Sequence, residues 1–334
     1  MMRGRTFIMM LAAVIMSSLS CQRRDFAEKV TEVNLVLNVK THVANAGEVA
    51  APETMRVDLY DIETGKLKYT DYVGAEGGYI HPAPGTYDMI IYNIGTEAVQ
   101  IRNESDINEI EAFTSEVSAY LKGQLAKFFA NIAKIKEERQ ARESQQRSKS
   151  PADEKVIYEP DHLFVGRADA VVIPVIYEGE EREVLIEIDA HPEVETWKVT
   201  VSNVKGLEYA QNVVAVMSGQ AESHFIGRGE DSGESVSVYF EKKKDMENNV
   251  LTGTFNTFGK HPTEKGILSL DINVTDTGGN DHHFHFDVDS QFQDNPDNHI
   301  VIDDPIEIEE PKVAGGGFAP TVDDWEDVNT DIDL

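Results

Sequence analysis

The stretch "GILSLDINVTD" (Gly266–Asp276) determines the fold class that we predict for this chain of 334 residues. From Leu268 to Val274 apolar and polar residues alternate: Leu268, Leu270, Ile272 and Val274 against Ser269, Asp271 and Asn273. Successive side chains of a strand point to opposite faces of its sheet. The stretch therefore predicts a β-strand with one buried face.

The same alternation recurs along most of the chain. Apolar residues take alternate positions in "EVLIEIDA" (183–190), "TWKVTVSNV" (196–204), "ESVSVYF" (234–240) and "HFHFDV" (283–288). Two strand-like runs between Arg56 and Val73 flank Thr64 and Gly65, which indicates a hairpin, and "GTYDMIIYNI" (85–94) follows a proline turn. Many short strands at close spacing are typical of β-sandwiches, so we predict a mainly β protein.

One segment breaks this pattern. Between Thr114 and Glu138 the apolar residues recur at helical spacing: Val117, Leu121, Leu125, Phe128, Phe129, Ile132 and Ile135. This predicts an amphipathic helix, within an insertion of about 114–148 that leads into a polar stretch ended by Pro151. The helix is expected to lie on the sheet of its own domain; binding to a partner or to a membrane surface is the alternative.

The length of the chain and its composition shifts suggest two domains. We place their boundary within 140–170, which gives an N-terminal β-sandwich domain at 35–155 and a C-terminal one at 156–310. A glycine-hinged acidic tail follows at 311–334. Its apolar residues Phe318, Val322 and Trp325 are expected to pack on their own domain, or to form a strand donated to another subunit.

The N-terminus has the pattern of an exported protein. Arg3 and Arg5 precede an apolar run from Thr6 to Met16 that is too short to span a bilayer. Small residues and Cys21, the single cysteine of the chain, come next. This order predicts a signal peptide at 1–20. Small residues before a cysteine resemble a bacterial lipobox, which implies cleavage before Cys21 and its acylation, with residues 21–34 as a tether. An ordinary secretory signal ending near a cysteine is the alternative.

The charge excludes one class of partner. The chain has 60 acidic and 30 basic residues and a net charge of −30. Nucleic acids and anionic lipids are bound through basic surfaces, so we expect neither as a partner. With one cysteine, no disulfide forms within the chain.

The strongest candidate for chemistry is "DHHFHFDVD" (Asp281–Asp289). On a strand, His283, His285, Asp287 and Asp289 would share a face, and histidines with carboxylates can hold a divalent metal. A solvent-facing strand surface is the simpler interpretation, and we assign no metal site. The acidic stretches lack the spacing of a calcium loop, and "GRGEDSG" (227–233) lacks the lysine of a phosphate loop. We therefore predict no catalytic residue and no cofactor.

Four stretches together point to a family: "HPAPGTYDMIIYNIGTEAVQIRN" (81–103), "EPDHLFVGRADAVVIPV" (159–175), "LTGTFNTFGK" (251–260) and "GGGFAPTVDDWEDVN" (315–329). In this order they resemble a Bacteroidales lipoprotein family of unknown function that is similar to fimbrillin-like anchor and accessory subunits of type V pili. The resemblance covers about residues 50–110 and 155–330. The helix predicted at 114–138 departs from the family pattern.

The resemblance implies two tandem transthyretin-like (fimbrillin-like) β-sandwich domains. It also implies a non-enzymatic role, as a lipid-anchored outer-membrane subunit of a fimbria-like assembly that binds pilin-like subunits by strand addition. In such pairing an inserted strand satisfies the free backbone groups of a sheet edge. A solitary lipoprotein that binds a glycan or host ligand, and a metal-dependent enzyme that uses His283 and His285, are the alternatives. Whether the protein faces the periplasm or the outside stays open.

Overall fold

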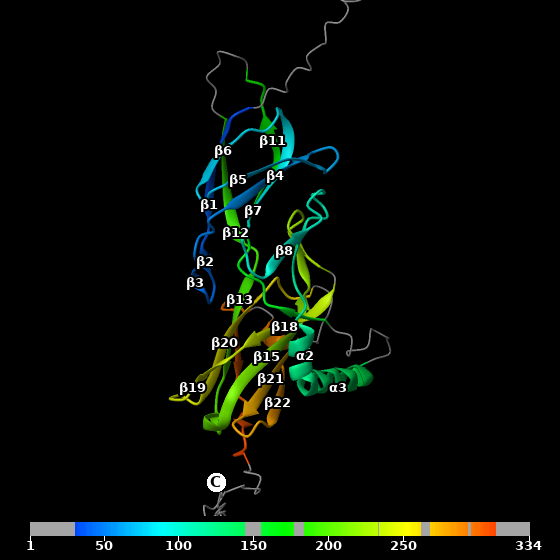
Figure 1. Ribbon diagram of the computed structural model, residues 1–334, viewed down its shortest axis with the longest axis vertical. Helices are drawn as coiled ribbons and strands as arrows, with labels where there is room; N and C mark the ends of the chain where they lie inside the picture. Colours follow the sequence, from blue (N-terminus) through cyan, green and yellow to red (C-terminus); the bar gives the residue numbers. More distant parts are fainter. Residues whose placement is uncertain are drawn as a thin grey trace, which may run out of the picture.

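The computed structural model describes residues 31–143, 155–176, 184–232, 234–261, 268–292 and 295–311. The described chain is mainly β-structure, arranged as two β bodies along the long axis of the molecule, with two helices beside the lower one (Figure 1). The mainly β fold class predicted from the alternation is confirmed. We call the upper body in Figure 1 the first half and the lower body the second half.

The first half is one seven-stranded sheet in the order β5-β4-β7-β11-β12-β1-β6. Its strands are β1 (Val33–Val39), β4 (Met55–Asp61), β5 (Leu67–Val73), β6 (Gly77–Ile80), β7 (Gly85–Asn93), β11 (Phe164–Ile173) and β12 (Val184–Pro192). The hairpin predicted around Gly65 is confirmed, because β4 and β5 pair on either side of it. Gly65 has a φ of 66°, a left-handed conformation that glycine adopts without strain.

This sheet folds over to enclose its own core. Most of β12 pairs in parallel with β1, whereas its last two residues, His191 and Pro192, pair with β11. The strand thus passes from one layer to the other. Between the layers lie the buried side chains of both: Val33, Leu35, Leu37, Met55, Val57, Leu59, Met89, Ile91, Phe164 and Ile188 are among them.

The second half is a two-sheet sandwich. A five-stranded sheet has the order β10-β18-β15-β21-β22, with β10 (Val156–Tyr158), β15 (Ala210–Ala221), β18 (Ser235–Glu241), β21 (Ser269–Asp276) and β22 (Asp281–Asp287). A four-stranded sheet has the order β19-β20-β13-β23, with β13 (Glu195–Val201), β19 (Lys243–Asp245), β20 (Val250–Thr257) and β23 (His299–Ile302). Trp197, one of the alternating apolar residues of the stretch 196–204, lies in the core between them and stacks on Phe292 with ring centroids 3.9 Å apart.

A small sheet joins the two halves. It has the order β17-β16-β9-β8, from β8 (Val99–Arg102), β9 (Glu111–Thr114), β16 (Ser223–Phe225) and β17 (Glu230–Asp231). A third buried cluster contains side chains from this sheet and from both halves, for example Tyr92, Ile110, Val194 and Phe258. The remaining short elements are β2 (His42–Val43), β3 (Gly47–Glu48), β14 (Val204–Lys205), β24 (Ile306–Glu307), η2 (Leu207–Tyr209) and η3 (Asp289–Gln291).

Two helices occupy the segment predicted to be helical, α2 (Ala119–Gln124) and α3 (Ala126–Glu143). The predicted start at Thr114 is wrong, because Thr114 ends β9 and pairs with Val99. The helix instead begins after Ser118, whose hydroxyl accepts the backbone N–H of Leu121 at 3.2 Å, a side-chain cap that serine forms readily.

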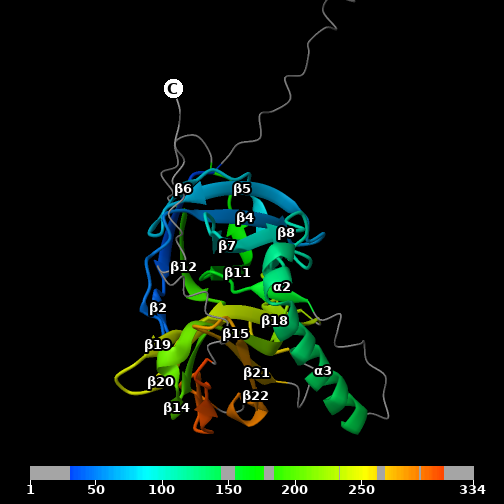
Figure 2. The ribbon, with the colours of Figure 1, turned by 60° about the horizontal axis from the view of Figure 1, so that its bottom comes forward.

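The helices lie on the second half, not on the first. Phe128 and Ile132 pack with Val214 and Val216 of β15 and with Tyr239 of β18. Figure 2 shows α3 running beside β21 and β22. The expected packing on the sheet of the N-terminal domain is therefore wrong. The helix fills the outer face of the five-stranded sheet, where β15 exposes apolar side chains that need burial.

The predicted boundary between residues 155 and 156 does not separate the sheets. Strand β10 belongs to the five-stranded sheet of the second half, whereas β11 and β12, which follow it, belong to the first half. The chain thus enters the second half at β10, returns to the first half for β11 and β12, and crosses to the second half for the last time near Glu193. Which half each of these strands joins depends on pairing between segments that are distant in the sequence, and no local pattern predicts such pairing.

Strand β21, where the fold prediction began, is confirmed as a strand, but both of its faces are buried. Leu270 and Ile272 enter the core of the sandwich, while Asp271 and Asn273 are buried on the opposite face. That face is covered because α3 lies against the neighbouring strand β22. The expectation of one solvent-exposed face is wrong for this strand.

The signal peptide 1–20, most of the tether 21–34 with Cys21, and the tail from residue 312 onward lie outside the described residues. Among the described residues, no helix is both long and apolar enough to cross a membrane.

Candidate functional site

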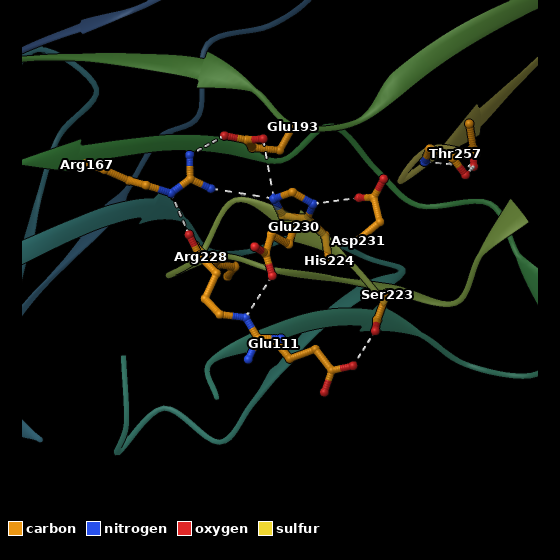
Figure 3. A network of polar contacts seen from close by, with 11 residues as sticks. Glu111, Arg167, Glu193, Ser223, His224, Arg228, Glu230, Asp231 and Thr257 are labelled. Carbon is orange, nitrogen blue, oxygen red and sulfur yellow. Dashed lines mark hydrogen bonds and ion pairs between the residues drawn. The ribbon is translucent and has the colours of Figure 1, made fainter. Parts of the chain in front are cut away.

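A network of charged side chains lies at the junction of the two halves, around Arg167 of β11 (Figure 3). Its guanidinium donates from Nη1 to Glu193 Oε1 at 2.6 Å and from Nε to the backbone oxygen of Ile226 at 2.6 Å. Glu193 lies where the chain crosses from β12 to β13, and Ile226 follows β16. Arg167, a residue of the first half, thus contacts both the segment that leads into the second half and the small sheet that joins the halves.

His224 of β16 extends this network. Its Nδ1 lies 2.9 Å from Asp231 Oδ1, and its Nε2 lies 3.4 Å from Glu193 Oε2. The Nη2 of Arg167 is 3.5 Å from the same Nε2. The imidazole is buried between two carboxylates. Charge-assisted hydrogen bonds of this kind fix orientation.

The adjacent residue Ser223 faces the other way and has a different partner. Its hydroxyl donates a short hydrogen bond to Glu111, and Arg102 binds the same carboxylate through two hydrogen bonds of 2.6 and 2.8 Å. Burial raises the pKa of Glu111, but the hydrogen bonds from Arg102 and Ser223 outweigh it and hold the pKa below its ordinary value. Ser223 and His224 therefore do not form a nucleophile and base pair.

Two glycines allow the strands of this network to approach closely. A Cβ on Gly166, next to Arg167, would lie 2.7 Å from Ile188 Cγ2. Gly259 has a φ of 139°, and a Cβ there would lie 2.6 Å from Asp231 Oδ2. A side chain at position 166 would press on Ile188, and one at position 259 would displace the carboxylate of Asp231. Both glycines thus leave room for the groups that pack around the network.

The histidines singled out in the sequence form a second, smaller group. His283 Nε2 and His285 Nδ1 both lie on Asp271 Oδ1, at 3.0 and 2.8 Å. The ring of Phe128 from α3 meets that of His283 edge to face, with centroids 5.3 Å apart. Among the described residues, no group of three or more His, Cys, Asp or Glu side chains is arranged to hold a metal ion.

Asp271 is ionised in this arrangement. Burial raises its pKa, but the hydrogen bonds from His283 and His285 outweigh burial, and the pKa lies below the ordinary value. An ionised carboxylate only accepts hydrogen bonds, so each imidazole donates an N–H to Asp271. The two rings are held on this strand pair and covered by α3. Their arrangement suits a structural role, in which the fixed ring of His283 provides a packing surface for Phe128 of α3.

The sheet edges differ in how well they are protected. The backbone of Val301 on β23 is bonded in both directions by the side-chain amide of Gln291, at 2.7 and 2.9 Å. Strand β10 is covered by the backbone of Ser115 and Val117. Strands β5 and β6 end the sheet of the first half, with no described strand beyond them. At the start of β5, however, Leu67 donates its backbone N–H to Ser105 O at 3.0 Å, so the uncovered part of this edge begins after Leu67. An edge without a neighbouring strand can pair with another chain.

Sequence reasoning missed the network around Arg167. Arg167 lies in the stretch "EPDHLFVGRADAVVIPV", but its partners Glu193 and Ile226 are 26 and 59 residues away. No spacing or motif connects them. The glycine-rich stretch at 227–233 lies at a hairpin: residues 226–229 connect β16 to β17, and Glu230 and Asp231 form β17. Cys21 lies outside the described residues.

Comparisons with known proteins identify the family. Residues 20–241 match the family described as "Domain of unknown function (DUF5119)". A curated relative from Bacteroides ovatus, named "Putative fimbrium anchoring subunit Fim4B", is 25% identical over 358 aligned positions, which cover 96% of this chain and 95% of the relative. A solved structure of a "putative adhesin" from Bacteroides ovatus has 23% identity and a TM-score of 0.60 over 87% of this chain and 98% of that one.

The solved structure supports the mainly β fold. The similarity to a family of unknown function related to fimbrial anchor subunits, inferred from four stretches, is confirmed. The family match spans residues 20–241, which is more than half of this chain. The chain therefore belongs to the DUF5119 family.

Proposed function

We propose that this protein is a lipid-anchored cell-envelope protein that serves as the anchor or accessory subunit of a fimbria-like assembly. The observation that carries this proposal is the similarity to a protein named as a fimbrium anchoring subunit over 96% of this chain and 95% of that relative. The role is structural and not catalytic. The paired charges around Arg167, which hold the two halves together, suit a subunit that bears load.

Acylation of Cys21 would provide the anchor. The cysteine follows a positively charged start, a short apolar run and small residues, which is the order expected for an exported lipoprotein. Several acyl chains on one residue hold a protein on a membrane more firmly than a single chain. The proposed site of attachment is the outer membrane.

The neighbouring fimbrial subunit would join by strand addition at β5. This strand ends its sheet and is seven residues long, whereas the opposite edge strand β6 has four. The N–H of Tyr72 donates to Asp71 Oδ1 at 2.9 Å, and the Tyr72 side chain is 53% exposed. An added strand would satisfy such outward backbone groups.

The variant Tyr72→Pro tests this edge. Proline lacks the N–H but is tolerated at an edge position whose N–H faces away from the sheet, so the protein should fold. Tyr72→Thr, which keeps the N–H, is the matched control. We expect cross-linking on intact cells and mass spectrometry to recover pilin-like subunits with the natural protein and Tyr72→Thr. Recovery with Tyr72→Pro should fall by roughly tenfold or more, in line with loss of main-chain pairing.

Three results of this experiment would count against the proposal. Equal recovery of pilin-like subunits with Tyr72→Pro would refute strand addition at β5. The absence of such subunits from the natural protein would refute the fimbrial role. An N-terminal peptide at Cys21 without acyl chains would refute the lipid anchor.

A further inference from the structure

The outer edge of the hairpin of β4 and β5 is already paired where β5 begins. Leu67 donates its backbone N–H to Ser105 O at 3.0 Å, and Ile107 donates its N–H to Gly65 O at 2.9 Å. Both hydrogen bonds involve the connection between β8 and β9, which here occupies the place that an added strand would need. We call residues 104–107 of this connection the stop segment.

Side chains also hold the stop segment on the first half. Arg56 Nη1 of β4 lies 2.6 Å from Glu104 Oε2, and the hydroxyl of Tyr60 donates to Glu104 O at 3.0 Å. Lys66 and Asp106 form an antiparallel bridge, and their side chains pair at 2.9 Å. Charge-assisted hydrogen bonds such as these fix orientation. The stop segment is thus held by backbone and side chains together.

The small joining sheet holds the same connection. A Cβ on Gly227, which follows β16, would lie 1.7 Å from Ile107 O, a close approach of two backbones that only glycine allows. The guanidinium of Arg228 donates from Nη1 to Asn108 O at 2.9 Å. Displacing the stop segment would disturb contacts with both the first half and the joining sheet, so an incoming strand would meet a fixed segment.

The free part of β5 is bounded at both ends. At its start the register with β4 shifts, and Lys68 is skipped in the pairing; such bulges disrupt a ladder locally. At its other end β5 stops at Val73, and a turn closed by the hydrogen bond from Gly77 N–H to Gly74 O, at 3.0 Å, leads into β6. Residues 68–73 are what remains for an added strand.

We propose that the stop segment bounds the site of strand addition, so that an extended segment of a pilin-like subunit pairs only with residues 68–73 and leaves the sheet at Leu67. This inference rests on the proposed strand addition at β5. The site then accepts about 20 Å of strand, at roughly 3.3 Å per residue. Register decides which side chains of a strand face the core. A bounded site therefore selects a partner segment whose extended stretch is short.

Hydrogen exchange distinguishes a stop segment that stays in place from one that is displaced. The full-length protein is purified from producing cells, alone and together with the pilin-like subunits bound to it. In the assembly we expect the amides of residues 68–73 to exchange at least about tenfold more slowly, because new pairing protects N–H groups. The amides of residues 105–110 should keep their exchange rates within about twofold, because their hydrogen bonds remain.

The variant Ile107→Pro removes one hydrogen bond of the stop segment. Glu109 donates its N–H to Asp106 O at 3.0 Å, so Ile107 is the second residue of a β-turn, a position that favours proline. Ile107→Val keeps the N–H and is the matched control. Protection in the partner should extend over about six residues with the natural protein and Ile107→Val. With Ile107→Pro it should lengthen by about two residues, because Gly65 O becomes free to pair.

The outcomes separate this inference from the proposed function. Faster exchange of residues 105–110 in the assembly would show that the partner displaces the stop segment, and would overturn the inference while leaving strand addition intact. An equally long protected stretch with Ile107→Pro would assign the boundary to the bulge at Lys68 and also overturn it. Unchanged exchange of residues 68–73 would refute strand addition at β5 itself, which Tyr72→Pro tests independently.

Discussion

Lys242 is a lysine whose amine is buried in the second half without a hydrogen-bond partner among the described residues. It continues the inward-facing series Val236, Val238 and Phe240 of β18 toward the core of the second half, and it is 7% exposed. Its ammonium nitrogen has no hydrogen-bond partner among the described residues and lies 5.5 Å from the ring centroid of Phe240. Burial lowers its pKa to about 7. A buried amine without a counter-ion opposes folding.

We predict that Lys242→Met stabilises the protein. At pH 7 the free energy of unfolding should rise by on the order of 3 kcal/mol, because the cost of burying the amine is removed. In the natural protein the unfolded chain binds more protons than the folded one between pH 7 and the ordinary lysine pKa near 10.4. Stability should therefore increase over that range. Urea unfolding at pH 7, 8.5 and 10 measures both effects; a variant with the same pH dependence would contradict the prediction.

Asp271 is the opposite case, a buried charge that is fully paired. The hydrogen bonds from His283 and His285 hold its pKa below the ordinary value despite burial. A carboxylate of this kind stabilises the fold above its ordinary pKa, and the contribution is lost as the pH falls toward the folded value. The contrast with Lys242 shows that pairing, more than burial alone, decides whether a buried charge favours the fold.

Helix α3 depends on tertiary packing more than on its own sequence. Phe128 is 2% exposed and Ile132 is 6% exposed, both against the outer face of the five-stranded sheet. The N-terminal part of the helical segment is exposed, with Tyr120 at 75%. Short helices are marginal in water without such packing. Phe128 is therefore the principal contact that holds α3 in place.

We predict that Phe128→Ala releases α3 before it unfolds the sheet. Truncation of a buried phenylalanine costs about 3 kcal/mol or more, and here the loss falls on one element. Hydrogen exchange should accelerate in residues 126–135 and stay slow in β15. Tyr120→Ala is the control and should change neither. Equal acceleration in helix and sheet would show that α3 and the sheet unfold as one unit.

At the scale of the whole molecule, the junction decides how the two halves are held. The chain leaves the first half after β7, passes through β8 and β9 of the small joining sheet and β10 of the second half, returns for β11 and β12, and crosses finally at Glu193. A buried cluster and the contacts of Arg167 join these passages. Several crossings, a shared core and ion pairs favour a fixed orientation of the halves. A fixed orientation of the halves suits the anchor role proposed above.

We predict that Arg167→Met loosens the junction without unfolding either half. It leaves Glu193 and the backbone oxygen of Ile226 without their donor, at a cost of about 1–2 kcal/mol after allowance for partial exposure. Small-angle scattering should show a broader distribution of overall dimensions, and exchange should accelerate in β16 and β17. Arg228→Met is the control, because its ion pair with Glu230 is more exposed. Unchanged scattering would assign the rigidity to the buried cluster alone.

The sequence by itself determined the mainly β class, the hairpin of β4 and β5, and the core positions of Trp197, Leu270 and Ile272. These follow from alternation and turn residues that are adjacent in the chain. The four quoted stretches also indicated the family. Each of these features depends on residues close together in sequence, which is why one sequence is enough to find them.

Only the tertiary structure decided which half contains β10, β11 and β12, that α3 covers the second half, and that Arg167 meets Glu193 and His224. The same holds for Asp271, whose position on a polar strand face predicted exposure but which α3 and β22 bury. These features arise from pairing and packing between segments tens of residues apart. A local pattern records which face of a strand is apolar, but the element that comes to lie on that face depends on the whole chain.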